Sequence, residues 1–157
     1  MTPAELATEH RRVGLDANVL IYLLEDDGSR SRRAAALLDA MEAGLTHGVL
    51  ATIGLSEILT GPARRGDLAA LERGAGEIRS MPGVSLEPLT AEVAVAAAVI
   101  RGSRAITIGD AIHLASARAA GATAFVTNDR RLRSAPHLEV VYLDDLEFEG
   151  EEPAADP

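Results

Sequence analysis

Four acidic residues, Asp16, Glu57, Asp110 and Asp129, fall where a parallel α/β sheet would gather them. Asp16 ends one apolar run and Asp129 follows another, as acids do just past buried strands. Glu57 and Asp110 each begin a helical pattern. Because strand ends and the starts of the following helices share one edge of such a sheet, the four carboxylates would repel one another strongly. A divalent cation between them would relieve that repulsion, so the pattern predicts metal-assisted hydrolysis.

Each acid also has an ordinary structural interpretation. Asp16 can cap the helix after it, and Asp110 can be an acid that the helix dipole favours in a first turn. Glu57 can be a capping glutamate, and Asp129 can be an Asx-turn residue. These interpretations need four separate local causes at one edge of the sheet, whereas a metal site needs only one. The joint pattern therefore favours the metal.

Oxygen ligands of this kind suit Mg²⁺ or Mn²⁺, which keep several waters and accept few protein carboxylates. Three polar residues adjoin the acids in the sequence, namely Asn18, Thr127 and Asn128. Side chains in such positions orient the ligands or a metal-bound water. The sequence leaves open whether the site holds one metal or two.

The rest of the chain alternates short apolar runs with amphipathic segments. This alternation predicts parallel strands joined by right-handed crossovers, with helices on both faces. We therefore expect an α/β protein, a three-layer α/β/α sandwich around a central, mostly parallel sheet of about five strands. The expected strands are 12–18, 48–53, 84–87, 123–127 and 140–143. The expected helices are 19–25, a segment capped by Ser29 or Ser31 and closed by Gly44, then 57–59 ended by Gly61 and Pro62, 66–79, 90–102 and 109–120.

Composition supports a single folded domain. Hydrophobic residues make up 47% of the 157 residues and aromatic residues only 3%, which fits helices packed on a sheet better than a base-stacking surface. The chain has no cysteine, which excludes disulfides, thiolate zinc sites and thiol nucleophiles. Residues 1–12 lack the apolar core of a signal peptide, and no segment approaches the roughly 18 apolar residues of a membrane span. We expect a cytoplasmic protein with no membrane partner.

The net charge of −9 is unevenly distributed along the chain. Seven acids and no base lie between residues 144 and 157, so removing those seven charges leaves −2 for residues 1–143. If the four candidate acids hold a metal, the remaining body is slightly basic, and the acidic total does not exclude a nucleic-acid partner. We expect one domain over residues 1–148, followed by a disordered acidic tail over residues 149–157.

The basic residues exclude one alternative chemistry. All 15 are arginine, and the chain has no lysine. Phosphoaspartyl enzymes, such as receiver domains and haloacid-dehalogenase-like phosphatases, normally use a lysine to stabilise the phosphoryl group, and arginine replaces it imperfectly. The histidines offer no alternative site, because none pairs at ligand spacing; we interpret His113 as a packed or partner-facing residue rather than a ligand.

Four segments, taken in order, resemble the acidic motifs of the PIN-domain nucleases, and most closely those of the VapC-type ribonuclease toxins of bacterial toxin–antitoxin pairs. These segments are Leu15–Ile21, Ser56–Gly61, Gly109–Ala117 and Phe125–Leu132, and the similarity in order and spacing covers roughly residues 11–143. The resemblance implies a compact PIN-like α/β/α sandwich with Mg²⁺-dependent endoribonuclease activity, in which Mn²⁺ can substitute. It also implies an RNA substrate, frequent homodimers and inhibition by a cognate antitoxin.

The resemblance assigns roles to the acids position by position. Asp16 and Asp110 would be the principal metal ligands, Asp129 a further one, and Glu57 would complete the catalytic set of four. Thr127 matches a hydroxyl residue that often precedes the last acid. Either Glu57 or Asp129 can serve as the general base.

RNA contacts would fall to arginines beside the site. We favour the cluster Arg130, Arg131 and Arg133, because it directly follows Asp129 and because the guanidinium group matches phosphate oxygens. Two alternatives keep the same fold. One is a PIN nuclease outside any toxin system, acting in RNA processing or on DNA, and the other is a binding module without activity.

Overall fold

The computed structural model describes residues 1–25 and 28–147, which form one parallel sheet covered by helices. The strand order is β3-β2-β1-β4-β5, and every neighbouring pair is parallel, so the predicted α/β sandwich is confirmed and its sheet is parallel throughout. The acidic tail expected over residues 149–157 lies outside the described residues. The elements are α1 (Pro3–Glu9), β1 (Arg12–Leu15), α2 (Ala17–Leu24), α3 (Gly28–Glu42), β2 (His47–Ala51), α4 (Thr52–Arg64), α5 (Leu68–Arg79), β3 (Val84–Glu87), α6 (Ala91–Ser103), α7 (Ile108–Ala119), β4 (Ala124–Thr127), β5 (Glu139–Tyr142) and the short 3-10 helix η1 (Leu143–Asp145).

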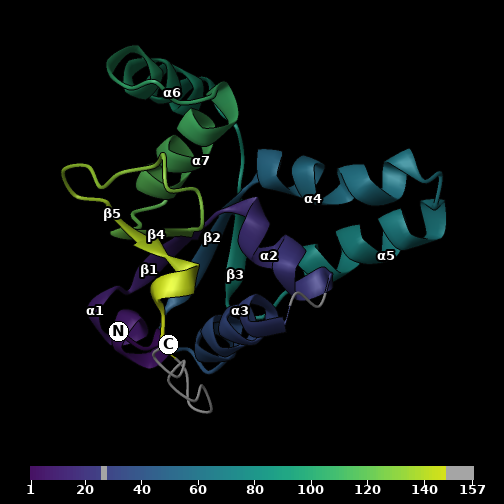
Figure 1. Ribbon diagram of the computed structural model, residues 1–157. Helices are drawn as coiled ribbons and strands as arrows, with labels where there is room; N and C mark the ends of the chain where they lie inside the picture. The colour runs from purple at the N-terminus through teal and green to yellow at the C-terminus, as the bar shows by residue number, and fades with distance from the viewer. Residues whose placement is uncertain (26–27, 148–157) are drawn as a thin grey trace, which may run out of the picture.

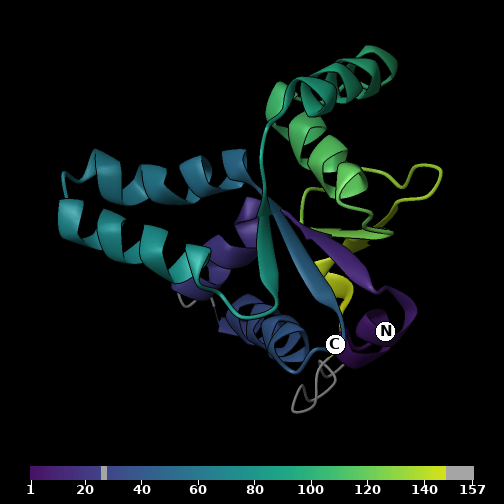
Figure 2. The same ribbon diagram turned by 180° about the vertical axis from the view of Figure 1, so that it is seen from behind.

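Helices cover both faces of the sheet, as Figures 1 and 2 show from opposite sides. Side chains alternate between the two faces along a strand, so Val13 and Leu15 of β1 enter the core shared with α1, α2 and α3. Gly14 faces the opposite way, towards α7. A Cβ at Gly14 would lie 2.6 Å from Ala117 Cβ and 2.7 Å from Phe125 Cδ2, so the bare backbone lets α7 pack directly on β1. α6 packs on α7.

Two strands end earlier than the sequence indicates, and a helix follows each almost at once. β1 stops at Leu15 rather than residue 18, which leaves Asp16 alone between β1 and α2. β2 stops at Ala51 rather than residue 53, and α4 begins at the next residue. The candidate acids near these turns are therefore attached to rigid elements rather than to loops.

α4 and α5 form a hairpin that projects beyond the sheet (Figure 1). The prediction of a short helix at 57–59, ended by Gly61 and Pro62, is wrong, because α4 runs from Thr52 to Arg64 with Pro62 inside it. Pro62 lies in the last turn of α4, where it cannot donate to the carbonyl of Ile58, and the helix ends two residues later. Glu57 consequently lies in the second turn of α4 rather than at its start.

The two ends of the described chain meet. No helix is predicted before residue 12, yet α1 occupies Pro3–Glu9 and buries Leu6 completely. Thr2 and Glu5 form a capping box at its start, a signal that the sequence does carry. The backbone N–H of Glu147 donates to the carbonyl of Met1 at 2.9 Å, and the Met1 ammonium lies 3.6 Å from the Glu147 carboxylate.

Two acids that the charge argument grouped with the tail belong to the folded body. Asp144 receives two hydrogen bonds from the Arg30 guanidinium, at 3.0 Å from Nε and 2.9 Å from Nη2, and Asp145 receives two from Arg130. Leu146, the next residue, is buried. In the described part of the chain, no helix is long and apolar enough to cross a membrane.

Candidate active site

The topology points to one place on the sheet before any side chain is considered. β1 and β4 lie side by side, with Leu15 paired to Val126, although they are far apart in the sequence. From β1 the sheet extends to β2 and β3 on one side, and from β4 to β5 on the other. In doubly wound sheets, ligands bind outside the carboxyl ends of the two strands at which the order reverses. Asp16 and Thr127 lie at those two strand ends.

Asp16 does not act as a helix cap through its side chain. It occupies the N-cap position of α2, but its carboxylate makes no capping hydrogen bond. Instead the carboxylate accepts from the Thr127 hydroxyl at 2.5 Å and from the Asn18 amide at 2.9 Å. Burial raises the pKa of Asp16, against the opposing effect of the Thr127 hydrogen bond. The carboxylate is thus held firmly in an environment that disfavours its charge.

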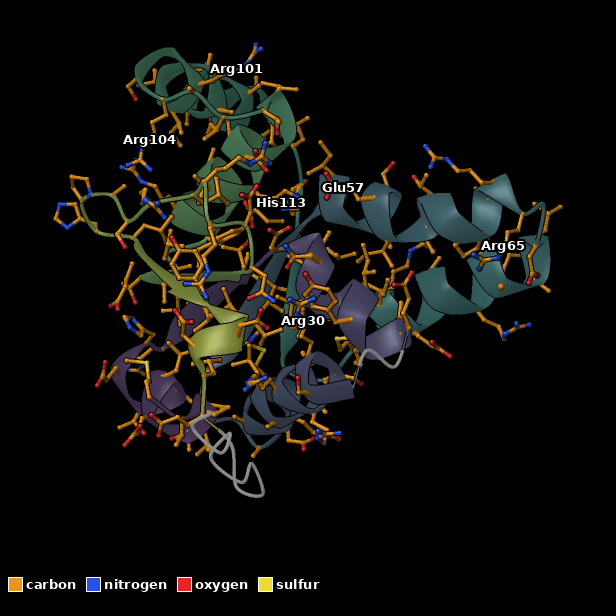
Figure 3. The ribbon with its side chains drawn as sticks, in the orientation of Figure 1. Arg30, Glu57, Arg65, Arg101, Arg104 and His113 are labelled. Carbon is orange, nitrogen blue, oxygen red and sulfur yellow. The ribbon has the colours of Figure 1, made fainter. Side chains whose placement is uncertain are left out.

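Glu57 and His113 meet between α4 and α7 (Figure 3). His113 Nε2 donates to Glu57 Oε2 at 2.8 Å, and the histidine side chain is 3% exposed whereas that of Glu57 is 42% exposed. Burial alone would lower the pKa of His113. The hydrogen bond to Glu57 and the negative charges of Asp16, Glu57 and Asp110 outweigh that effect and raise the pKa. The ring therefore lies in the field of three of the predicted acids.

Three side chains come within reach of a single ion. Asp16, Glu57 and His113 each offer a ligand atom, and these atoms all lie within 4.8 Å of one another. The metal set predicted from the sequence was Asp16, Asp110 and Asp129. Of these three, only Asp16 belongs to the group with Glu57 and His113. Asp110 and Asp129 lie to one side of this group and are engaged differently.

Asp110 has a structural role at the start of α7. Its backbone N–H donates to the Thr107 hydroxyl at 3.1 Å, and its carboxylate accepts from the Thr107 backbone N–H at 3.1 Å, which completes a capping box. Asp110 therefore does have the structural role, in the first turn of a helix, that its ordinary interpretation assigns to it. Asp110 also lies one turn before His113 on the same face of α7, which directs it towards the acidic group.

Asp129 forms the Asx-type turn that the sequence allowed, and an arginine covers it. Its carboxylate accepts from the backbone N–H of Arg131 at 2.9 Å and from the Arg131 guanidinium at 2.5 to 3.0 Å. The hydrogen bond from Arg131 lowers the pKa of Asp129. Arg131 Nη2 also lies 4.0 Å from Asp110 Oδ2. The Arg131 guanidinium therefore lies against both Asp110 and Asp129.

The other two arginines of the predicted RNA-binding cluster are held by neighbouring groups. Arg130 forms a bidentate pair with Asp145, at 2.6 and 2.8 Å, and its guanidinium lies 4.1 Å from the centre of the Tyr142 ring. Arg133 donates to the Tyr142 hydroxyl at 2.7 Å and to the carbonyl of Arg130. All three side chains of the cluster thus have partners within the protein.

The predicted supporting residues divide in the same way. Thr127 and Asn18 lie against Asp16, and the Thr127 hydroxyl also accepts from the Asp129 backbone N–H at 3.0 Å. Asn128 instead faces the end of the chain: its amide donates to Asp144 at 3.1 Å and its carbonyl accepts from the Asp144 backbone at 2.9 Å. Asn128 therefore braces η1 and does not contact Asp16.

Sequence reasoning missed His113 as part of the site. No second histidine lies at ligand spacing from it, so the sequence pattern does not mark it as a ligand. His113 nevertheless lies three positions after Asp110 and shares a face of the helix with it, and helical side chains lean towards the N-terminus. The imidazole is also long enough to span the gap to Glu57. Its interpretation as a packed residue was right, since the ring is buried, but it packs inside the acidic group.

The residues present fit a divalent metal. Carboxylate oxygens suit Mg²⁺ and Mn²⁺, and the imidazole beside them holds one of the carboxylates by a hydrogen bond. Asn18 Oδ1 is buried beside Asp16 and has no hydrogen-bond partner among the described residues, as expected of a group that faces an ion or its water. The partly buried charge of Asp16 likewise favours a nearby cation, and no described arginine pairs with it.

Comparisons with known proteins agree with this geometry. The family model described as the PIN domain matches residues 13–138. A sequence search of curated proteins gives no match. VapBC2 from Rickettsia felis, in a crystal structure with a DNA fragment from its promoter, has a similar chain with a TM-score of 0.63 and 16% identity, covering 83% of this chain and 98% of that one. A toxin–antitoxin complex from Klebsiella pneumoniae gives a TM-score of 0.59 and 19% identity, covering 81% of this chain and 94% of that one. At these identities the two structures show a shared fold.

Proposed function

The chain belongs to the PIN-domain family, and from that premise we propose that it is a Mg²⁺-dependent endoribonuclease that acts as the toxin of a toxin–antitoxin pair. Mn²⁺ would substitute for Mg²⁺. The family and the fold support hydrolysis of a nucleic-acid backbone. RNA as the substrate and the antitoxin as a partner are the finer parts of the proposal, and both need their own tests.

One observation carries the proposal. Asp16 and Glu57 come together beyond the carboxyl ends of β1 and β4, where the strand order reverses, and their ligand atoms lie within 4.8 Å of one another and of His113. Neither acid has an arginine partner among the described residues. Acids that serve only to stabilise a fold are usually paired when they are buried. An acid whose pKa is raised by burial and which has no arginine partner among the described residues, placed at the ligand edge of the fold, is expected where a cation binds during function.

The residues divide the work as follows. Asp16 would hold the metal on the inner side, oriented by Thr127 and Asn18, and Asp110 and Asp129 would hold it on the outer side. When bound, the metal lowers the pKa of a coordinated water and offsets charge on the phosphoryl oxygens.

Glu57 would take the proton from the attacking water, because Asp129 would be engaged as a metal ligand and Oε1 of Glu57 has no hydrogen-bond partner among the described residues. The water oxygen would bond to phosphorus as the phosphorus–oxygen bond opposite it breaks, and the ribose oxygen would leave with that electron pair and take a proton from solvent.

Arg131 would have a double role in this scheme. In the absence of metal it neutralises Asp129 and lies close to Asp110. A metal bound by the same two acids would compete with the guanidinium, which is 67% exposed and free to turn towards solvent. The released arginine would then be placed to bind a phosphate of the substrate. Arg130 and Arg133 would contribute to the same RNA contact, and each would have to give up its present hydrogen bonds to do so.

A partner protein would find an apolar hollow beside the acids. It lies between α2 and α4, has a volume of about 210 Å³ and is lined in part by Ile21, Leu24, Ile58 and Pro62, with Glu57 at its border. An antitoxin segment seated there would block access to the site, and both solved structures described above are toxin–antitoxin complexes.

We include the homodimer in the proposal; α6 exposes Val95 and Val99 one turn apart, as an apolar contact surface would.

Expression of the wild type and of Asp16→Asn in a bacterial host tests the proposal. The wild type should arrest growth and produce new RNA 5′ ends at defined sites, and the variant should do neither. Coexpression of a small protein encoded next to the toxin gene should restore growth. Purified protein that cleaves DNA but not RNA would instead support a PIN nuclease outside a toxin system.

A further inference from the structure

α4 and α7 cross in a reciprocal arrangement that the acidic motifs do not explain. Each helix supplies a glycine opposite a polar side chain of the other. Gly54 of α4 faces His113 of α7: a Cβ there would come within 3.0 Å of His113 Cε1 and 2.7 Å of Leu50 Cδ1. Gly109 of α7 faces Glu57 of α4, where a Cβ would come within 3.3 Å of Glu57 Oε1. The two glycines make room for the two side chains that bond to each other.

The contact between those side chains is specific. His113 Nε2 to Glu57 Oε2, at 2.8 Å, is the only hydrogen bond that the Glu57 carboxylate makes within residues 1–25 and 28–147. The other oxygen, Oε1, has no hydrogen-bond partner among these residues. Because Glu57 is 42% exposed, its side chain would sample several rotamers without that bond.

The ring that holds Glu57 is itself immobilised. His113 is 3% exposed and lies against Phe125, with ring centres 6.3 Å apart. Its Nδ1 is buried without a hydrogen-bond partner, so the ring is fixed by packing and by Glu57 alone. Both the neutral Nε2–H tautomer and the imidazolium donate at Nε2, so the hold on Glu57 does not depend on the charge of the ring.

We infer that His113 is a positioning residue, which holds the Glu57 carboxylate towards Asp16 so that Oε1 is left for the reacting water. This inference deepens the proposed function and rests on it. It predicts that the loss of His113 lowers turnover without weakening substrate binding, because Glu57 would remain present but misplaced. Substitution of such supporting partners typically costs about 10- to 100-fold in activity or metal affinity.

The test compares His113→Leu with His113→Gln, whose amide nitrogen can replace Nε2 as the donor. With Mn²⁺ and a pool of single-stranded RNA oligonucleotides, His113→Leu should lose about 10- to 100-fold in kcat with little change in KM, and His113→Gln should recover most of that loss. In a Glu57→Ala background, His113→Leu should have no further effect. Equal losses in both variants, an unchanged kcat in His113→Leu, or additive losses in the double variant would overturn the inference.

Two glycine variants keep the test informative if His113→Leu does not fold. Gly54→Ala keeps the histidine, but the added Cβ would crowd the His113 ring and shift it from its present position. This variant should therefore lower kcat in the same way. Gly76→Ala, in α5, is the matched control, because an added Cβ there meets nothing within 4 Å, and its kcat should equal that of the wild type. Wild-type activity in Gly54→Ala would count against the inference.

A second readout separates failure of this inference from failure of the proposed function. If the wild type binds Mn²⁺ but cleaves no RNA, the proposed function is wrong. The contact can then be read from the ¹⁵N resonance of His113 Nε2, which should shift in Glu57→Gln if the two side chains are bonded in solution. A resonance that does not move would overturn the inference by itself.

Discussion

The four acids form two pairs that differ in how their charge is compensated. The inner pair, Asp16 and Glu57, is held by a hydroxyl, an amide and an imidazole, and has no arginine partner in the described part of the chain. The outer pair, Asp110 and Asp129, has local structural roles, a capping box and an Asx-type turn, and shares the guanidinium of Arg131. The pKa of Asp16 is raised by burial, whereas that of Asp129 is lowered by Arg131.

This difference separates two ways of keeping carboxylates close together. The outer pair is stable as it stands, because each acid would be kept for its turn or cap even without chemistry. The inner pair has no such local purpose, and the desolvated charge of Asp16 opposes folding. The destabilisation that accompanies the site therefore comes from the inner pair. Neutralising Asp16 should stabilise the protein, whereas neutralising Asp129 should destabilise it.

The largest expected effect comes from Asp16→Asn. Loss of the inner metal ligand should remove several kcal/mol of transition-state stabilisation, so RNA cleavage should fall about a thousandfold or more. The fold should persist with an equal or higher Tm, because the asparagine still accepts from Thr127 without a buried charge. Cleavage rates and thermal melts measure both effects, with Glu42→Gln on the exposed surface of α3 as the control. An active Asp16→Asn protein would eliminate the inner pair as the functional half.

Metal binding should stabilise the protein by mass action. At a Mg²⁺ concentration about 100 times Kd, the gain is about 2.7 kcal/mol, or roughly 5 to 10 °C in Tm for a domain of this size. Asp16→Asn should abolish this shift, and Asp129→Asn should only reduce it. The measurement is a melt with and without Mg²⁺, using Ca²⁺ to detect nonspecific effects. Equal losses in the two variants would remove the distinction between the pairs.

The pairs should also respond to pH in opposite senses. The raised pKa of Asp16 means that its ionisation costs stability as the pH rises above the ordinary value of about 3.9. The lowered pKa of Asp129 means that its contribution is present above about 3.9 and is lost as the pH falls through the lowered value. In metal-free buffer, the Tm gain of Asp16→Asn over the wild type should grow with rising pH. The Tm loss of Asp129→Asn should shrink as the solution is acidified, and parallel curves would contradict both assignments.

The smallest effect concerns Arg131. Arg131→Gln removes a cation that competes with metal for the outer pair, an exposed interaction worth about 0.2 to 1 kcal/mol. Mn²⁺ should therefore bind up to about fivefold more tightly to this variant in calorimetric titrations. Arg130→Gln is the matched control, because its partner is Asp145 rather than an outer acid. Weaker Mn²⁺ binding to Arg131→Gln would show that the arginine helps to form the metal site.

The sequence predicted the sheet because its signals are local. Apolar runs and helical periodicity placed the predicted strands and most of the helices, and Thr90 and Thr107 mark helix starts through their side-chain caps. The error at α4 arose from reading Gly61 and Pro62 as a stop, whereas the helix begins at Thr52 and continues for two residues past the proline. α1 was missed because only a few of its side chains face the core.

The site was harder to predict because its contacts join distant segments. The four acids could be found from their positions beside strands and helices, and Thr127 and Asn18 from their adjacency. The bond between Glu57 and His113 crosses 56 positions, and the pair of Asp144 with Arg30 crosses 114. No local pattern encodes such partners. The division of the acids into two pairs likewise depends on where Arg131 reaches in three dimensions.

The meeting of Met1 with Glu147 has a practical consequence for engineering. Met1 precedes α1 and Glu147 follows η1 in the chain. The N-terminus (Figure 1) lies away from Glu57 and His113, which Figure 3 labels in the same orientation. Cutting the chain after Glu147 and joining that residue to Met1 through a short linker would close residues 1–147 into a ring, because the two residues already share a backbone hydrogen bond. New ends could then be opened at Gly66, in the turn between α4 and α5, where a Cβ would meet nothing within 4 Å. Such a circular permutant should keep the sheet and the acids intact, and fluorescent labels at its new ends would report on partners that approach the α4–α5 hairpin.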